Sequence, residues 1–75
     1  MQLTELHQGD RAKIVSVDAT KTLKQRLASL GVVRGETLVL RGCSLAKQTM
    51  EIEIDATLVA LRSKEAQTIT IAPLP

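Results

Sequence analysis

A chain of 75 residues has room for one domain, close to the size at which a core only just offsets the entropy of the chain. The absence of Phe, Tyr and Trp excludes the aromatic grooves that bind proline-rich peptides and the aromatic platforms that stack on unpaired bases. A net charge of +2 is too small to indicate nucleic acid by itself, and a single cysteine excludes an internal disulfide and offers no zinc spacing.

Basic side chains are concentrated in the middle of the chain. Residues 11–47 hold eight Lys or Arg and two acids, whereas the flanks hold two bases and six acids. An excess of one charge in a segment either steers an oppositely charged partner or keeps a surface solvated. Both interpretations stay open from the sequence.

No stretch of the chain predicts a membrane span or a leader. No apolar run approaches the roughly 18 residues that a spanning helix requires, and no charged segment precedes an apolar one at the start. We therefore expect a cytoplasmic protein with a single domain over residues 1–75 and no insertion into a membrane.

The first elements are predicted to be a helical turn and a strand. Leucines at both ends of residues 3–6 would anchor the turn, and Gly9 with Asp10 is a turn signal. The β-branched run 12–17 predicts the first strand. Because apolar residues fall on both of its faces, we expect this strand to be covered on both sides.

A helix of about three turns is predicted next, since Leu23, Leu27 and Leu30 recur at i, i+4 and i+7 on one face. This leucine stripe should lie across a sheet, because so short a helix is not stable alone. The bases that lie largely off the stripe are expected in solvent: Lys21, Lys24 and Arg26. Three residues are candidate N-caps, the last of them in a weak capping box with Gln25: Asp18, Thr20 and Thr22.

The helix is expected to end in a left-handed turn at Gly31, the residue after the last apolar helical position. Val32 would then fold back onto Leu27, as it commonly does in this motif. Gly35 supplies a second permissive position before the next strand.

The rest of the chain predicts strands over 36–41, 49–54, 57–62 and 68–71, with a loop over 42–48 and a short helical turn over 63–66. The alternation in 49–54 is the most regular and predicts a half-buried antiparallel strand. Its inward residues are Met50, Ile52 and Ile54, and its outward ones are Glu51, Glu53 and Asp55, with Arg41 expected across from Glu51. Five short strands and one interrupting helix indicate a mainly β, partly open small barrel.

The sequence offers little for catalysis, metal or nucleotide. His7 and Cys43 are single and lie in opposite halves of the chain. Glu51, Glu53 and Asp55 share one strand face, but alternate strand positions are roughly 7 Å apart, too far for two of them to share an ion unaided. No phosphate-binding glycine loop is present. We therefore expect neither an enzyme nor a cofactor.

Three stretches resemble the motifs of the FeoA family, and together they span most of the chain. In chain order they are Leu3-x-x-Leu6-x-x-Gly9-Asp10-x-Ala12-x-Ile14, Arg26-Leu27-x-x-Leu30-Gly31-Val32-x-x-Gly35 and Ala60-Leu61-Arg62-x-x-Glu65-Ala66-x-x-Ile69-x-Ile71. The resemblance implies a small SH3-like barrel that accompanies FeoB, the bacterial membrane transporter for ferrous iron. It further implies a non-enzymatic accessory that engages the transporter's cytosolic part, which carries a GTP-hydrolysing domain.

The chain departs from the family pattern in two places. Many members have proline before the second glycine, where this chain has Arg34, and many have Gly and Pro in the hairpin at residues 46–49. That hairpin is therefore expected to be longer or more mobile. Neither departure touches the expected core.

Other functions remain as alternatives to a transport accessory. One is a regulatory barrel resembling the C-terminal domain of iron-dependent repressors, although those barrels follow a helix-turn-helix and a dimerisation region, and this chain starts at Met1 with neither. Another is a nucleic-acid-binding protein, but the basic segment at residues 11–47 is the only feature that supports it. We therefore expect no nucleic-acid partner. Weak self-association through open sheet edges is a further expectation.

The expected contact surface for the transporter is the exposed basic side of the helix, at Lys21, Lys24 and Arg26. Exposed charges of one sign mainly influence association rate and partner choice. A second set of residues is expected to hold the motif in shape: Leu27, Leu30, Gly31 and Gly35.

Overall fold

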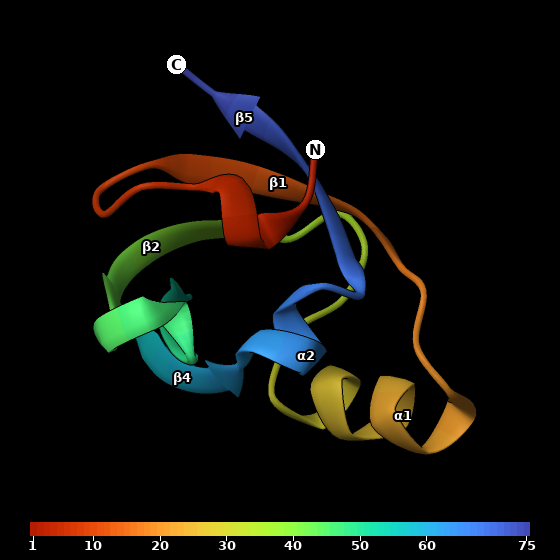
Figure 1. The fold of residues 1–75 in the computed structure, drawn as a ribbon. Coiled ribbons are helices and arrows are strands. Elements are labelled where there is room, and N and C mark those ends of the chain that lie inside the picture. The colour runs from red at the N-terminus through yellow and green to blue at the C-terminus, as the bar shows by residue number, and fades with distance from the viewer.

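The computed structural model describes residues 1–75, except for the side chain of Lys47. It is an antiparallel five-stranded sheet in the order β4-β3-β2-β1-β5, curled around a core (Figure 1). The elements are β1 (Arg11–Val17), α1 (Lys21–Ser29), β2 (Thr37–Cys43), β3 (Thr49–Ile54), β4 (Thr57–Arg62), α2 (Ser63–Ala66) and β5 (Ile69–Leu74), with short 3₁₀ turns at Leu3–Glu5 and Leu45–Lys47. The predicted mainly β barrel with one helix is confirmed. Two strands run further than predicted, β2 into the expected loop and β5 to Leu74.

The core is apolar throughout. Among the described residues no polar or charged side chain is buried. The buried residues come from every strand, from the first turn, from both helices and from the loop after α1: Leu3, Leu6, Ala12, Ile14, Leu27, Val32, Leu38, Leu40, Met50, Ile52, Ile54, Val59, Leu61, Ala66, Ile69 and Ile71. Every polar or charged side chain that the structure describes is therefore at least partly exposed.

The β3–β4 hairpin is built as its alternation predicts. Ile52 lies opposite Val59 and Met50 opposite Leu61, so cross-strand apolar pairs fill the core side. The two residues that join the strands both have left-handed backbones, Asp55 at φ 50° and Ala56 at φ 64°. This is the sign pattern of a type I′ turn, whose twist matches that of the strands.

Strand β1 is not covered on both sides as predicted. Its register with β5 shifts between Ile14 and Ser16, which leaves Val15 at an irregularity of the ladder with 44% of its surface exposed. Val17 is partly buried and packs against the core. The presence of apolar residues on both faces therefore overstated how much of this strand is covered.

A second bulge changes an expected ion pair. The register between β2 and β3 shifts between Leu40 and Gly42, so Arg41 has no direct partner in the ladder. Its Nε lies 2.8 Å from Oε1 of Glu53, and the predicted pairing with Glu51 is wrong. Sequence spacing alone does not reveal where a strand inserts an extra residue.

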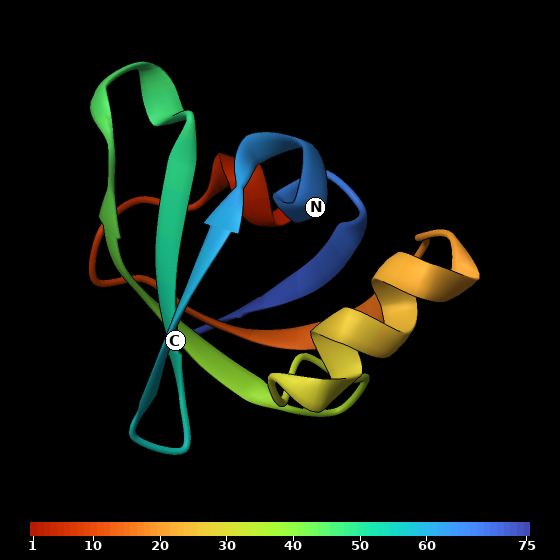
Figure 2. The same cartoon turned by 90° about the horizontal axis from the view of Figure 1, so that it is seen from below.

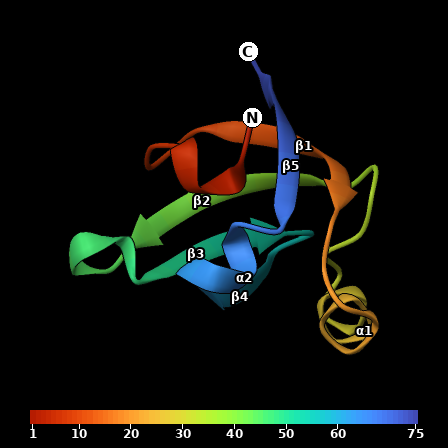
Figure 3. The ribbon, with the colours of Figure 1, turned by 45° about the vertical axis from the view of Figure 1, so that its right-hand side comes forward.

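Helix α1 stands at one end of the barrel and does not lie across the sheet (Figures 2 and 3). Its N-cap is Thr20, whose Oγ1 accepts a hydrogen bond from the Leu23 N–H at 3.3 Å. Thr22 consequently lies inside the helix, and the capping box predicted for it is wrong.

The leucine stripe of α1 is only partly buried. Leu27 is fully buried and Leu23 packs against the core, but Leu30 is 37% exposed, contrary to the prediction. Leu30 is the C-cap, with φ −91° and ψ 0°, so the chain has already left helical geometry there. A periodicity of 3.6 residues no longer applies to its side chain.

The end of α1 is a Schellman motif, as predicted. Gly31 has φ +91°, its N–H donates to Ala28 O at 3.0 Å, and the Val32 N–H donates to Leu27 O at 2.9 Å. Val32 and Leu27 are both buried. Gly35 is likewise left-handed, at φ +93°.

The N-terminal residues cover the outer edge of β5. Gln2 forms an isolated bridge with Thr70, and the Ile71 N–H donates to Met1 O at 2.7 Å. The C-terminal end of β5 extends away from this bridge (Figure 1). One edge of the sheet is thereby capped by the chain's own first residues.

Candidate docking site beside the helix

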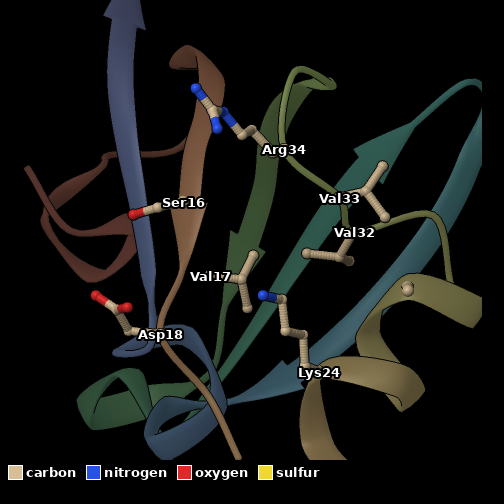
Figure 4. A pocket seen from close by; sticks show the side chains of 8 residues that line it. Ser16, Val17, Asp18, Lys24, Val32, Val33 and Arg34 are labelled. Atoms are coloured by element: carbon tan, nitrogen blue, oxygen red, sulfur yellow. The ribbon is translucent and has the colours of Figure 1, made fainter. Parts of the chain in front are cut away.

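A pocket of about 270 Å³ opens where three segments meet: the end of β1, helix α1 and the loop that follows the helix (Figure 4). Its apolar surface is supplied by Val17 from β1, Ala28 from α1, and Val32 and Val33 from the loop. Val32 is buried, whereas Val33 is 37% exposed. The pocket thus has an apolar base connected to the core and an accessible rim.

Two cations flank this apolar base. Lys24 rises from α1 with its amine directed between Val17 and Val32, and Arg34 lies at the opposite end of the pocket (Figure 4). Both residues are exposed, and among the described side chains neither takes part in an ion pair. Their charges are therefore available to a ligand.

The end of β1 and the residue after it also bring polar groups to the pocket, beside Val17. Ser16 and Asp18 line it, and in Figure 4 their oxygens point away from Lys24. Asp18 is exposed, and its backbone N–H donates to Thr68 O at 2.7 Å. With one carboxylate against two cations, the pocket carries an excess of positive charge.

The loop that forms the pocket is fastened to the barrel. The Gly35 N–H donates to Ile14 O at 2.8 Å, and the Ile14 N–H donates to Glu36 O at 2.8 Å. Together with the Schellman bonds at the helix end, these contacts hold the loop at both of its ends. The pocket is therefore preformed.

The three bases predicted as a contact surface have different surroundings. Lys21 is exposed on the first turn of α1, and Lys24 lines the pocket. Arg26 instead pairs through its Nη1 with Glu65, whose side chain is only 12% exposed and also accepts from the Arg62 N–H at 2.9 Å. This ion pair connects α1 to α2, so the guanidinium of Arg26 is already engaged.

The residues considered for chemistry are dispersed. His7 is largely exposed, with Nδ1 3.8 Å from Oδ2 of Asp10, and Cys43 is exposed at the end of β2. Within the described part of the chain no three His, Cys, Asp or Glu side chains gather in a way that would hold a metal ion. Nor does any described helix have the length and apolar character needed to cross a membrane.

Sequence reasoning missed the pocket itself. Arg34 was noticed only as a departure from a family proline, and Val33 was not singled out. The one feature of the sequence that could have pointed to Val33 and Arg34 is their position between Gly31 and Gly35. Both glycines have left-handed backbones, and the short loop between them is exposed at Val33 and Arg34. That signal does not say which other segments the loop will face.

Comparisons with known proteins agree along almost the whole chain. The FeoA domain model matches residues 1–73. The chain is 42% identical over 71 residues to Fe(2+) transport protein A of Campylobacter jejuni, covering 95% of this chain and 96% of that protein. It is 32% identical over 71 residues to a fusion of Fe(2+) transport protein A with Fe(2+) transporter FeoB from Porphyromonas gingivalis, of which it spans 8%.

Solved structures show the same fold. FeoA of Chlorobium tepidum superposes with a TM-score of 0.93 at 36% identity, over 100% of this chain and 71% of that one. A manganese-dependent transcriptional repressor superposes with a TM-score of 0.89 at 26% identity, over 97% of this chain and 40% of the repressor. Stenotrophomonas maltophilia FeoA, described as an SH3 domain protein complexed with zinc, gives 0.82 at 28% identity, over 96% of this chain and 89% of that one. With a family model matched from residue 1 to residue 73, the chain belongs to the FeoA family.

Proposed function

We propose that this chain is a non-enzymatic accessory of ferrous-iron uptake that acts by contact with the cytosolic, GTPase-bearing part of an FeoB transporter. The observation that carries the proposal is the Porphyromonas gingivalis protein, in which a matching domain and FeoB are one chain. A covalent link raises the effective concentration of two modules that work together. Separately encoded modules need a contact surface of their own.

The arrangement of the domain supports action by contact. Its core is apolar, and the described residues bring no catalytic or metal-binding cluster together. The exposed basic side of α1 is the surface proposed for the contact, with Lys21 and Lys24 as its free charges. Arg26 belongs to the same surface but contributes less, because Glu65 already neutralises its charge.

The direct test is a binding measurement between this chain and the purified cytosolic region of the transporter at two salt concentrations. We expect a saturable complex that weakens as salt rises, because screening shortens the reach of exposed charges. The charge-reversed double variant Lys21→Glu with Lys24→Glu should fold normally and bind more weakly, chiefly at low salt. Absence of any complex with the wild-type chain would contradict the proposal.

A second test separates an accessory from an iron carrier or a nucleotide-binding protein. Calorimetric titration of the purified chain with ferrous iron, and separately with GTP, should show no stoichiometric binding, because the described side chains form no ligand cluster and the sequence has no phosphate loop. A one-to-one micromolar site for either ligand would contradict the simple accessory role.

A regulatory barrel is the second candidate, favoured by the likeness to the manganese-dependent repressor. The two candidates differ in what loss of the gene does to the cell. An accessory changes the rate of iron uptake at constant transporter abundance, whereas a regulator changes the abundance of the transporter's messenger RNA. Measuring both quantities in a deletion strain distinguishes them.

A further inference from the structure

We propose that the pocket between β1, α1 and the loop after the helix is the docking site for a partner segment in which an aliphatic side chain stands beside a carboxylate. The inference rests on the proposed function, because the partner segment is assigned to the cytosolic region of the transporter. It places the contact at a site that combines Lys24 with Arg34, a residue outside the basic helix surface.

The size and the apolar lining of the pocket indicate that one part of the ligand is an aliphatic side chain. The pocket's volume of about 270 Å³ lies below the range of about 300–1,000 Å³ typical of sites for whole small molecules. Its apolar lining consists of Val17, Ala28, Val32 and Val33, and the chain has no aromatic ring to stack on a nucleobase or a proline. A short aliphatic side chain fits these dimensions.

The cations at the rim of the pocket, which form no described ion pair, indicate that the other part of the ligand is a carboxylate. Lys24 and Arg34 lie at opposite ends of the apolar base (Figure 4), so a carboxylate next to the seated side chain is within the field of both. Arg offers a planar fork of donors that matches a carboxylate. Asp18 lines the side of the pocket next to β1, where its negative charge disfavours a ligand with a second carboxylate.

The pocket needs little rearrangement to accept such a segment. The Val33 N–H donates to Gly31 O at 3.1 Å and the Glu36 N–H donates to Val33 O at 3.2 Å, so bonds within the loop brace its tip. A preformed site avoids the ordering cost that weakens flexible interfaces.

The experiment compares matched variants in binding to the transporter's purified cytosolic region. The pocket double variant Lys24→Glu with Arg34→Glu should weaken binding by at least about tenfold, since it places two acids where a carboxylate is to dock. Its control is Lys13→Glu with Lys64→Glu, which changes net charge equally at two exposed lysines outside the pocket and should stay within about twofold. Thermal melting checks that both variants fold.

An apolar pair tests the other half of the ligand. Val33→Asp should also weaken binding by about tenfold or more, because it puts a polar acid at the seat of an aliphatic side chain. The control is Val15→Asp, at a valine that is 44% exposed on β1 and outside the pocket. Both variants are expected to melt within a few degrees of the wild-type chain.

The outcomes separate this inference from the proposed function. If the wild-type chain does not bind the cytosolic region at all, the proposed function fails. If it binds and the pocket variants bind as tightly as their controls, the docking pocket is wrong while the proposed function stands. Retention of the wild-type chain, but not the pocket double variant, on anionic lipid vesicles with no binding to the protein region would overturn the protein ligand in favour of a membrane surface.

Discussion

The barrel and the helix differ in how completely they are packed. In β3 every inward residue is buried, with Ile52 at 0% exposure and Ile54 at 3%. In α1, which has nine residues, only Leu27 is buried. The helix is therefore an attachment to the barrel, held by the buried Leu27 and the partly buried Leu23, by the Schellman motif and by an ion pair to α2. Most of the buried apolar surface that stabilises the fold is therefore in the barrel. The surface proposed for partner contact lies beside the helix.

The largest effect is expected where the two regions are joined. Leu27→Asp buries an unpaired charge and should cost more than about 4 kcal/mol, comparable with the whole stability of a small domain. Leu30→Asp, one turn further at a residue that is 37% exposed, should leave the fold intact. Circular dichroism at 25 °C compares the two variants. A folded Leu27→Asp protein would show that the helix is dispensable to the barrel.

A pair of leucine truncations measures the difference between the regions directly. Leu61→Ala in β4 should destabilise by about 2–5 kcal/mol, because it leaves a cavity in a fully packed core. Leu23→Ala in α1 should cost about 1 kcal/mol, since that side chain is only partly buried. Urea denaturation gives both values. Equal losses would mean that helix and barrel are packed alike.

The left-handed turn at the end of the helix should show an intermediate effect. Gly31→Val should destabilise by about 1–3 kcal/mol because valine is strained at positive φ. Crowding contributes little, as a Cβ there would meet only Ile54 Cγ2 at 3.9 Å. The control is Ala28→Val on the exposed side of α1, which should cost about 0.5 kcal/mol from helix propensity. Identical melting temperatures for Gly31→Val and the wild-type chain would remove the argument from backbone strain.

The smallest effect concerns the ion pair that ties the helix to α2. Arg26→Ala should cost between about 0 and 1 kcal/mol, because Arg26 is 57% exposed and solvent screens the pair. Lys21→Ala, with no described ion pair, should change stability by less than about 0.5 kcal/mol. Thermal melting and a binding assay on the same variants separate a structural role from a role in binding. If Arg26 is structural, Arg26→Ala lowers the melting temperature more than it lowers the affinity for the partner. A larger effect on affinity than on stability would mean that Arg26 contributes to the contact as fully as Lys21 and Lys24.

Local patterns made much of the barrel predictable. Strict alternation in residues 49–54 gave both the strand and its buried face, and Gly31 marked the helix end. The bulges at Val15 and Arg41 were not predictable, because a ladder irregularity depends on the partner strand as much as on its own sequence. Those bulges expose a valine and redirect an ion pair.

The candidate site was harder to foresee than the fold. Lys24 was expected at the surface, but its neighbours Val17 and Val33 come from segments that only the tertiary fold brings together. Arg26 looked equivalent to Lys24 on a helical wheel. The two residues differ because Arg26 pairs with Glu65, which lies 39 positions after Arg26 in the chain and could not be identified as its partner from the helix alone.

The two ends of the chain are unequal as points of attachment. Met1 and Gln2 are hydrogen-bonded along β5, so a tag or a neighbouring domain joined ahead of them starts from the edge of the sheet. The other end of the chain leaves from the tip of β5, away from that bridge (Figure 1). Coupling through the first residues therefore pulls on the bridge that covers the outer edge of β5, whereas coupling through the last residue pulls on the end of β5 itself, where Leu74 lies opposite Arg11 of β1.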